Sequence, residues 1–163
     1  MCLFFYHFIW KKDIIKEDKK FKRSLLEGRW DMLKSYQLKT KREEMIDITG
    51  LVEDCLEESG VQEGICLVYC PHTTGAISVN ENTDPAVQED IFLALQENLP
   101  DNPNFNHLEG NSRAHLLSSL FGASQGFIIQ DGRLLLGTWQ GIYFLEFDGP
   151  RTRSFYVKIL GGK

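Results

Sequence analysis

The sequence predicts an α+β domain in which about three helices accompany many antiparallel strands. Three observations support this prediction. Apolar residues recur with helical spacing in three segments that have cap or stop signals at their ends. Short runs of alternating or continuous apolar residues separate these segments. Two of the last runs flank Asp131-Gly132, which is a strong two-residue signal for a β-hairpin.

The first half of the domain is predicted to contain four strands and one helix. The stretches LKSYQLKT and EEMIDIT alternate as strands do. Thr49 can cap a helix over about 50–59, and Gly60 is a natural stop just past its end. GICLVYC is a nearly continuous apolar run, which predicts a buried central strand, and GAISVN alternates after it.

The second half contains the other two predicted helices. Asp84-Pro85 supplies an N-cap and a proline at the first helical position, and the apolar spacing predicts an amphipathic helix over 85–99. The polar stretch DNPNFNHLEGN is typical of a loop. Asn111 or Ser112 can cap a short helix that Gly122 ends. GFIIQ, RLLLGTW, QGIYFLEF and RSFYVKIL are the remaining predicted strands.

Composition limits the classes of function. The chain has 163 residues, 42% hydrophobic and 25% charged, which suits one globular domain. The net charge of -5 argues against a nucleic-acid partner, and no apolar run approaches the roughly 20 residues that cross a membrane. The four cysteines form no CxxC pair, so we expect free thiols, mostly buried, and a cytoplasmic location.

The first 31 residues differ from the rest. The apolar run MCLFFYHFIW precedes a basic stretch, whereas a secretory signal places its positive charge before the apolar run. Residues 1–31 hold 8 basic against 5 acidic residues, and residues 32–163 hold 10 against 18. We predict that 1–31 is an extension, poorly ordered or peripherally docked, and that 32–163 is a single domain for which Met32 is a candidate start.

Three histidines are candidate metal ligands. His72 follows the predicted buried strand, His107 lies in the polar loop, and His115 lies in the first turns of the short helix. A catalytic zinc typically has three protein ligands and one open position, and neutral imidazole is a common ligand. The spacing matches no compact metal motif, so unrelated surface or core histidines are the alternative.

Two groups of polar residues accompany these histidines. Glu109 is a candidate fourth ligand, partner of a histidine, or general base for a metal-bound water, and a solvated loop carboxylate is the alternative. Thr73 and Thr74 stand beside His72, where their hydroxyls can bind a phosphate or satisfy the turn backbone.

Further candidates for substrate binding lie near strand ends. Asn80 belongs to the polar segment NEN that ends the GAISVN strand. Arg133 follows the predicted hairpin turn, and Trp139 and Gln140 lie within GTWQG. Glycines inside a strand often mark a bulge or a close backbone approach. Core packing is the favoured interpretation of Trp139, and a flat wall of a binding pocket is the alternative.

Four long motifs in this order resemble the YjbQ family, whose members are often labelled secondary thiamine-phosphate synthase. They are CPHTTGAISVNENTDP, NFNHLEGNSRAHLLSSLFG, DGRLLLGTWQGIYFLEFDGPRTR and VKILG. The resemblance covers about residues 33–161. It implies a compact α+β fold with a mostly antiparallel sheet, a barrel-like core and a homotrimeric assembly. It also implies a metal or anion site near subunit contacts.

The resemblance places the family's histidines on His72, His107 and His115. Some relatives have an acidic residue where this chain has Leu108, so an additional carboxylate ligand is in doubt, but Glu109 remains. The catalytic residues that we predict are His72 and Glu109. Three histidines favour zinc or another transition metal, whereas magnesium would want oxygen ligands.

The family label implies an enzyme that joins a pyrimidine methyl diphosphate to a thiazole phosphate and releases pyrophosphate. A metal suits this chemistry because it screens the diphosphate charge. Two alternatives remain at this point. One is a non-enzymatic homotrimer that binds a metal or a small phosphorylated ligand or anion. The other is a metal-dependent hydrolase with Glu109 as base.

Overall fold

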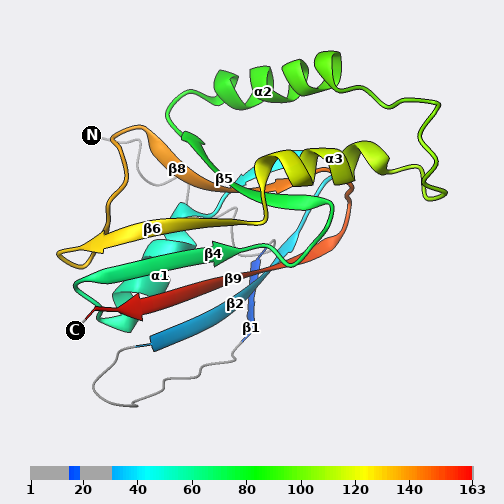
Figure 1. Cartoon of the computed structure of the whole chain (residues 1–163). Helices are drawn as coiled ribbons and strands as arrows, with labels where there is room; N and C mark the ends of the chain where they lie inside the picture. The colour runs from blue at the N-terminus through cyan, green and yellow to red at the C-terminus, as the bar shows by residue number, and fades with distance from the viewer. Residues whose placement is uncertain (1–14, 19–30, 163) are drawn as a thin grey trace.

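The computed structural model describes residues 15–18 and 31–162, which form nine strands and three helices (Figure 1). The α+β prediction, with about three helices, is confirmed. The elements in chain order are β1 (Ile15–Asp18), β2 (Asp31–Lys39), β3 (Glu44–Asp47), α1 (Thr49–Ser59), β4 (Gly64–Tyr69), β5 (Gly75–Glu81), α2 (Pro85–Asn98), α3 (Ser112–Phe121), β6 (Ser124–Gln130), β7 (Arg133–Leu134), β8 (Gln140–Glu146) and β9 (Thr152–Gly161).

The strands form two antiparallel sheets. The larger sheet has the order β1-β2-β9-β4-β6-β7 and the smaller one the order β3-β8-β5. Together they curl as a half-barrel, so the predicted barrel-like core is confirmed in this form. Helices α2 and α3 lie over the small sheet, and α1 lies behind β4 and β9 (Figure 1).

The core has two parts because β8 is buried on both faces. Ile142 and Phe144 point into the main cluster, which also contains buried residues of α1 and the large sheet. Tyr143, Leu145 and Phe147 pack with α3 on the opposite face. A strand buried on both sides has almost no polar residue, so the fully buried Glu146 at its end requires an explanation.

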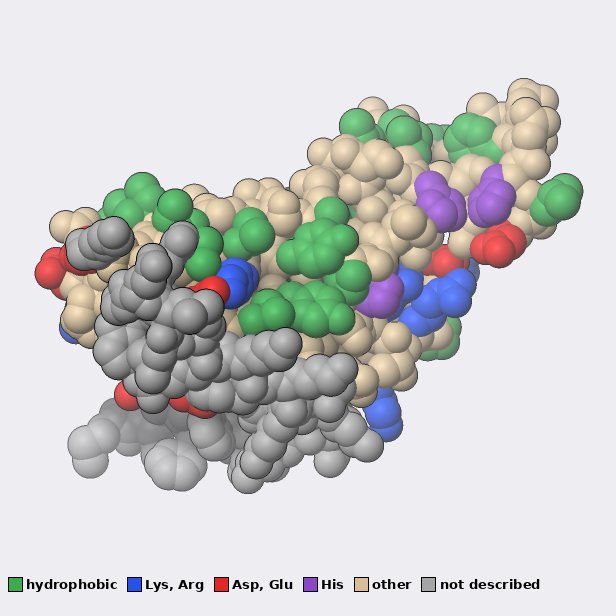
Figure 2. All heavy atoms as spheres, turned by 60° about the horizontal axis from the view of Figure 1, so that its bottom comes forward, with side chains coloured by type: hydrophobic (Ala, Val, Ile, Leu, Met, Phe, Trp, Pro, Cys, Tyr) green, Lys and Arg blue, Asp and Glu red, His purple; other side chains and the backbone are tan. Residues whose placement is uncertain are grey.

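Strand β4 departs from its prediction. It is central, between β9 and β6, but only one of its faces is buried. Cys66 and Val68 are fully buried, whereas Ile65, Leu67 and Tyr69 are 40–54% exposed. The continuous apolar run therefore reflects an apolar outer surface of the large sheet, where Figure 2 shows hydrophobic side chains gathered.

The helix caps are confirmed in part. Asp84 caps α2 as predicted, since its side chain accepts from the Ala86 N–H at 2.9 Å. Thr49 does not cap α1, because it lies inside the helix and its hydroxyl accepts from the Ile142 N–H at 2.8 Å. Asn111 is the N-cap of α3 by position, but its side chain makes no capping hydrogen bond.

The thiol prediction is confirmed for the three cysteines that the structure describes. Cys66 and Cys70 are free thiols, the Cys55 thiol lies 3.7 Å from Met32 Sδ, and all three cysteines are buried. Burial raises the pKa of the Cys66 thiol to about 12 and that of the Cys70 thiol to about 11. Because the thiolate is the reactive form, these side chains act as small core hydrophobes.

The predicted N-terminal extension lies largely outside the described residues. Its residues Ile15–Asp18 form β1, which pairs with β2 at the edge of the large sheet. The division at residue 31 stays a prediction, although Asp31 is already part of β2, opposite Leu160. Among the described residues, no helix has the length and apolar character needed to span a membrane.

Candidate functional site

A buried ion pair lies at the end of β8 and the start of β9. The Arg153 guanidinium donates to both carboxylate oxygens of Glu146 at 2.6 Å, and both side chains are buried. The Thr40 hydroxyl and the Asp148 N–H donate to the same carboxylate, at 2.7 and 2.8 Å. Arginine and backbone donors hold the pKa of Glu146 below its usual value although burial opposes them. The pair therefore stays charged inside the fold.

This ion pair holds the turn that contains His72 and the two threonines. Arg153 Nη2 donates to Thr74 Oγ1 at 2.7 Å, and Thr74 is buried. The Ser154 N–H donates to His72 Nε2 at 2.9 Å. Thr73 is exposed. The hydroxyl of Thr74 therefore has a structural partner, and that partner is a side chain, neither a phosphate nor the turn backbone.

The hydrogen bond to His72 also defines its tautomer. Because Nε2 accepts the Ser154 N–H, the neutral ring carries its proton on Nδ1. Burial and then the Arg153 charge lower the pKa of His72, which favours this neutral form. In this arrangement His72 offers an Nδ1–H donor to a ligand, while its Nε2 lone pair is already used.

We expect the free energy of unfolding to fall as pH drops below the unfolded histidine pKa of about 6.5. Stability falls with pH because the pKa of His72 is lower in the folded chain than in the unfolded chain. As pH drops, the unfolded chain therefore binds the proton first. The loss should end once pH passes below the folded-state pKa. Urea unfolding of wild type and His72→Gln across this range checks it, since Gln can still accept from Ser154. Equal pH slopes in the two proteins would contradict the assignment.

A second polar layer connects the ion pair to the loop before α3. Asp148 accepts from Arg151 Nη2 at 2.7 Å and from Asn111 Nδ2 at 3.0 Å. Burial opposes ionisation of Asp148, but these donors and the arginine charges hold its pKa below the usual value. Asn111 Nδ2 also lies 3.5 Å from Glu109 Oε2. A continuous set of contacts therefore runs from Arg153 to Glu109.

The other two histidines lie together at the outer end of these contacts. The rings of His107 and His115 meet edge to face, with centroids 5.2 Å apart. Glu109 Oε2 is 3.9 Å from His107 Nε2, and both side chains are well exposed. Glu109 and His107 are therefore at ion-pair distance but beyond direct hydrogen-bond distance of each other.

The three described histidines share one face of the molecule. Figure 2 shows two of them adjacent and the third beyond, with basic and acidic side chains between. We call the set His72, His107, Glu109, His115 and Arg151 the histidine–arginine cluster. Within residues 15–18 and 31–162 of this single chain, no group of three or more His, Cys, Asp or Glu side chains could hold a metal ion. The metal site therefore stays a prediction.

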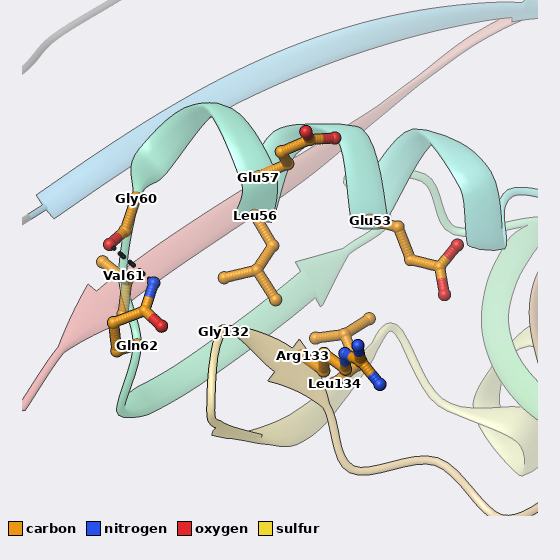
Figure 3. A pocket seen from close by; sticks show the side chains of 9 residues that line it. All are labelled: Glu53, Leu56, Glu57, Gly60, Val61, Gln62, Gly132, Arg133 and Leu134. Carbon is orange, nitrogen blue, oxygen red and sulfur yellow. Dashed lines mark hydrogen bonds between the residues drawn. The ribbon is translucent and has the colours of Figure 1, made fainter.

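Four predicted substrate-binding residues lie elsewhere. Asn80 pairs with Gly141 at the end of β5 far from Thr74, next to Gln140. Trp139 is 59% exposed, so the interpretation as a core residue is wrong. Arg133 lines a separate cavity of about 450 Å³ between α1 and the β6–β7 hairpin, where Figure 3 shows it below Glu53 and Leu56. Sequence order alone could not show these separations.

Sequence reasoning missed the buried pair. Glu146 ends the apolar strand QGIYFLEF, and an acidic residue in a strand buried on both faces signals a buried partner. Sequence reasoning also missed Asp148 and Arg151, which lie in the turn between β8 and β9. The available signal was the clustering of charge within EFDGPRTR.

Comparison with known proteins gives the family. The family model described as UPF0047 protein YjbQ-like matches residues 34–162. The chain belongs to the YjbQ family. It is 59% identical over 133 residues to UPF0047 protein MJ1081 of Methanocaldococcus jannaschii, which covers 81% of this chain and 96% of the relative. It is 55% identical over 132 residues to UPF0047 protein YugU of Bacillus subtilis, covering 80% of this chain and all of the relative.

Solved YjbQ-family structures have the same fold. A family member from Clostridium acetobutylicum superimposes with a TM-score of 0.75 at 53% identity, covering 77% of this chain and 98% of the other. A YbjQ-like protein from Sulfolobus solfataricus gives a TM-score of 0.78 at 35% identity, covering 82% and 99%. The family resemblance read from the motifs is therefore confirmed, along with its fold.

Proposed function

We propose that this YjbQ-family chain is an enzyme that acts on a phosphorylated small molecule bound at the histidine–arginine cluster. The observation that supports the proposal is the surface that the three described histidines share (Figure 2). Hydrogen bonds to Asp148 connect Arg151 to the loop of His107 and Glu109 through Asn111, and inward to the Glu146–Arg153 pair. Imidazole and guanidinium donors on one surface suit phosphate oxygens. The network beneath holds two of these donors in position, since Ser154 binds the His72 ring and Asp148 binds the Arg151 guanidinium.

Four members of the cluster have roles in the proposed reaction. His72 donates from Nδ1 to a phosphate oxygen, since its Nε2 accepts from Ser154. Arg151 is paired with Asp148, but its side chain is 50% exposed, so its remaining N–H groups can donate to the anion. His107 and Glu109 are 3.9 Å apart and both reach solvent, so one bridging water would connect them. The pair would then give a proton to the leaving pyrophosphate or, in hydrolysis, take one from the attacking water.

The reaction that we propose is a thiamine-phosphate synthase-like transfer. A thiazole nitrogen forms a bond to the methylene carbon of a pyrimidine methyl diphosphate, and the carbon–oxygen bond to the diphosphate breaks. Pyrophosphate leaves with the electron pair of that bond. Donors at the cluster would stabilise the charge that develops on the leaving group. Hydrolysis with Glu109 as base would use the same residues with water as the nucleophile.

A bound divalent metal is a separate proposal. Such a metal would screen the diphosphate charge. His107 and His115 are adjacent and would supply two nitrogen ligands, which suits zinc or another transition metal better than magnesium. His72 fits less well, because its Nε2 already accepts a hydrogen bond. We therefore assign no step of the reaction to a metal.

We also propose that the chain assembles as a homotrimer through the outer face of the large sheet. This sheet face is defined by Leu33, Ile65, Leu67, Tyr69 and Ile128, which are 38–58% exposed. A contiguous apolar surface of this kind is unusual on a monomer and is typical of an interface. The face adjoins the histidines in Figure 2, so a neighbouring subunit would approach the cluster.

Binding of inorganic pyrophosphate tests the site. We expect Arg151→Gln to weaken binding by about 10- to 100-fold, since a hydrogen bond to a charged group contributes roughly 1.5–3 kcal/mol. Arg133→Gln is the matched control, because Arg133 is an exposed arginine that lines the other cavity. Titration calorimetry of both variants and the wild type measures the difference. Equal affinities in all three proteins would reject the cluster as the site.

Turnover decides between enzyme and binding protein. Pyrophosphate release from a pyrimidine methyl diphosphate, with and without a thiazole phosphate, should occur with the wild type. His107→Ala should abolish it while leaving the melting temperature unchanged. Tight pyrophosphate binding without any turnover would favour the non-enzymatic alternative. Metal analysis of the purified wild type beside a His107→Ala/His115→Ala variant tests the metal proposal independently.

A further inference from the structure

A small cavity of about 90 Å³ lies at the N-terminus of α3, separate from the cavity that Arg133 lines. Its lining comes from the β2–β3 turn, the loop before α3, the first turn of α3 and the turn that follows β8. It shares Arg42, Glu43, Asp101 and Arg113 with an open cavity of about 470 Å³. The two cavities together can accommodate a small head group and a larger body.

Two residues that line the small cavity each have a buried polar atom without a hydrogen-bond partner. They are Asn111 Oδ1 and Arg113 Nη2, and they are the two such side-chain atoms among the described residues. A buried polar atom that lacks a partner is costly, so each one indicates a missing ligand or solvent contact. One of these atoms is an acceptor and the other a donor.

The orientation of the Asn111 amide follows from its surroundings. Its Nδ2 faces the carboxylates of Asp148 and Glu109, at 3.0 and 3.5 Å, and a carboxylate accepts from nitrogen. The amide oxygen is therefore the atom left over. At an N-cap this oxygen ordinarily accepts from the first turn of the helix, but here it makes no capping bond.

Arg113 is fixed by its other nitrogens. It is only 7% exposed, its Nε donates to the Leu99 carbonyl oxygen at 2.6 Å, and its Nη1 donates to Glu43 Oε1 at 2.9 Å. A guanidinium is planar and rigid, so these two bonds fix the direction of Nη2. The unpaired N–H groups cannot turn away to find another partner.

The charges around the cavity are already balanced. Glu43 neutralises Arg113, and Arg151 neutralises Asp148. The remaining charged lining residues, Arg42 and Asp101, are exposed and of opposite sign. An anionic ligand would face the carboxylates of Glu43, Asp101 and Asp148. The buried cation of the lining, Arg113, is already paired with Glu43. The small cavity therefore favours an uncharged ligand.

We propose that this cavity binds the amide edge of an uncharged small molecule. The ligand's carbonyl oxygen accepts from Arg113 Nη2, and its neighbouring N–H donates to Asn111 Oδ1. Carboxamides and cyclic amides such as pyrimidinones present this acceptor–donor pair. The body of the ligand extends into the larger cavity between Gln96 and Arg42. The inference does not depend on the proposed transfer reaction.

Ligand titrations followed by ¹⁵N-edited NMR of the full chain test the proposal. Acetamide and uracil should shift the Asn111 side-chain amide and the Gly110 N–H in a saturable way. N,N-dimethylacetamide keeps the acceptor but lacks the N–H, so we expect it to bind about tenfold more weakly, because it leaves Asn111 Oδ1 unpaired. Inorganic phosphate serves as the anionic probe.

A pair of arginine variants tests whether the amide binds in the cavity that Arg113 lines. Arg113→Lys should weaken acetamide binding about tenfold, whereas Arg133→Lys, the same change in an exposed arginine of the other cavity, should not. If Arg113→Lys fails to fold, the comparison of acetamide with N,N-dimethylacetamide on the wild type still tests whether the ligand's N–H is needed for binding. Equal binding of those two probes, binding of phosphate in place of acetamide, or no saturable shift with any amide would overturn the proposal.

Discussion

Arg153→Met is expected to lower the free energy of unfolding by about 3–5 kcal/mol, because it leaves the Glu146 carboxylate buried without its counter-ion. Glu146 is fully buried, and Arg153 supplies two of its hydrogen bonds at 2.6 Å. The Thr74 hydroxyl loses its arginine donor in the same variant. Urea unfolding at neutral pH measures the change.

The double variant Glu146→Gln/Arg153→Met is the control, since it removes both charges. We expect it to recover most of the lost stability, because replacing a buried pair with uncharged groups is often close to neutral. In the wild type the pKa of Glu146 is lowered. Its contribution is therefore present above the unfolded carboxyl pKa of about 4.3 and is lost as pH falls through the lower folded value. A double variant no more stable than Arg153→Met would show that packing, not charge, is responsible.

Leu67→Asp is expected to convert the proposed homotrimer to a monomer, a threefold fall in mass by light scattering. Leu67 lies at the centre of the sheet face, opposite Gly126 on β6 and Lys158 on β9, and is 40% exposed in the single chain. Lys158 is already paired with Asp31, so a carboxylate at position 67 would lack a full counter-ion inside the interface. Burying it there costs several kcal/mol per subunit, whereas in a monomer it remains in water.

Leu93→Asp is the matched control, because Leu93 is an exposed leucine on α2, outside the sheet face. It should leave the mass unchanged, and both variants should keep the wild-type circular dichroism. A wild type that is already monomeric would reject the homotrimer. A wild-type trimer that Leu67→Asp leaves intact would reject this face as its interface.

The elements with strong local signals were predictable because their causes are local. Asp84 and Pro85 define the start of α2 through backbone geometry within one turn. Asp131 and Gly132 both have positive φ, at 51° and 72°, as a two-residue hairpin turn requires. The hairpin is present, but β7 has only two residues, because a ladder continues only where its partner strand lies alongside.

The burial of apolar residues could not be predicted from the run that contains them. GICLVYC has apolar residues on both faces of β4, and the sequence cannot say whether the second face meets a helix or an open surface. In the same way Trp139 has a side chain typical of a core but is exposed. Burial depends on what packs opposite, and that is a property of the whole fold.

In the candidate site, too, the sequence shows which residues are present, but only the fold shows which of them lie together. The sequence by itself determined the family and the α+β class, since these depend on residue identity and order. It predicted the segments around His72, His107, Glu109 and His115 as the candidate site. Only the tertiary structure decided which polar residues lie together. It brings Glu146, Arg153 and Asp148 beneath the histidines and places Arg133, Asn80 and Gln140 elsewhere. The physical reason is strand pairing, of β4 with β9 in the large sheet and of β5 with β8 in the small one. Thr74 lies in the turn between β4 and β5, so this pairing brings it against Arg153, about 80 positions away, while β5 itself separates Thr74 from Asn80.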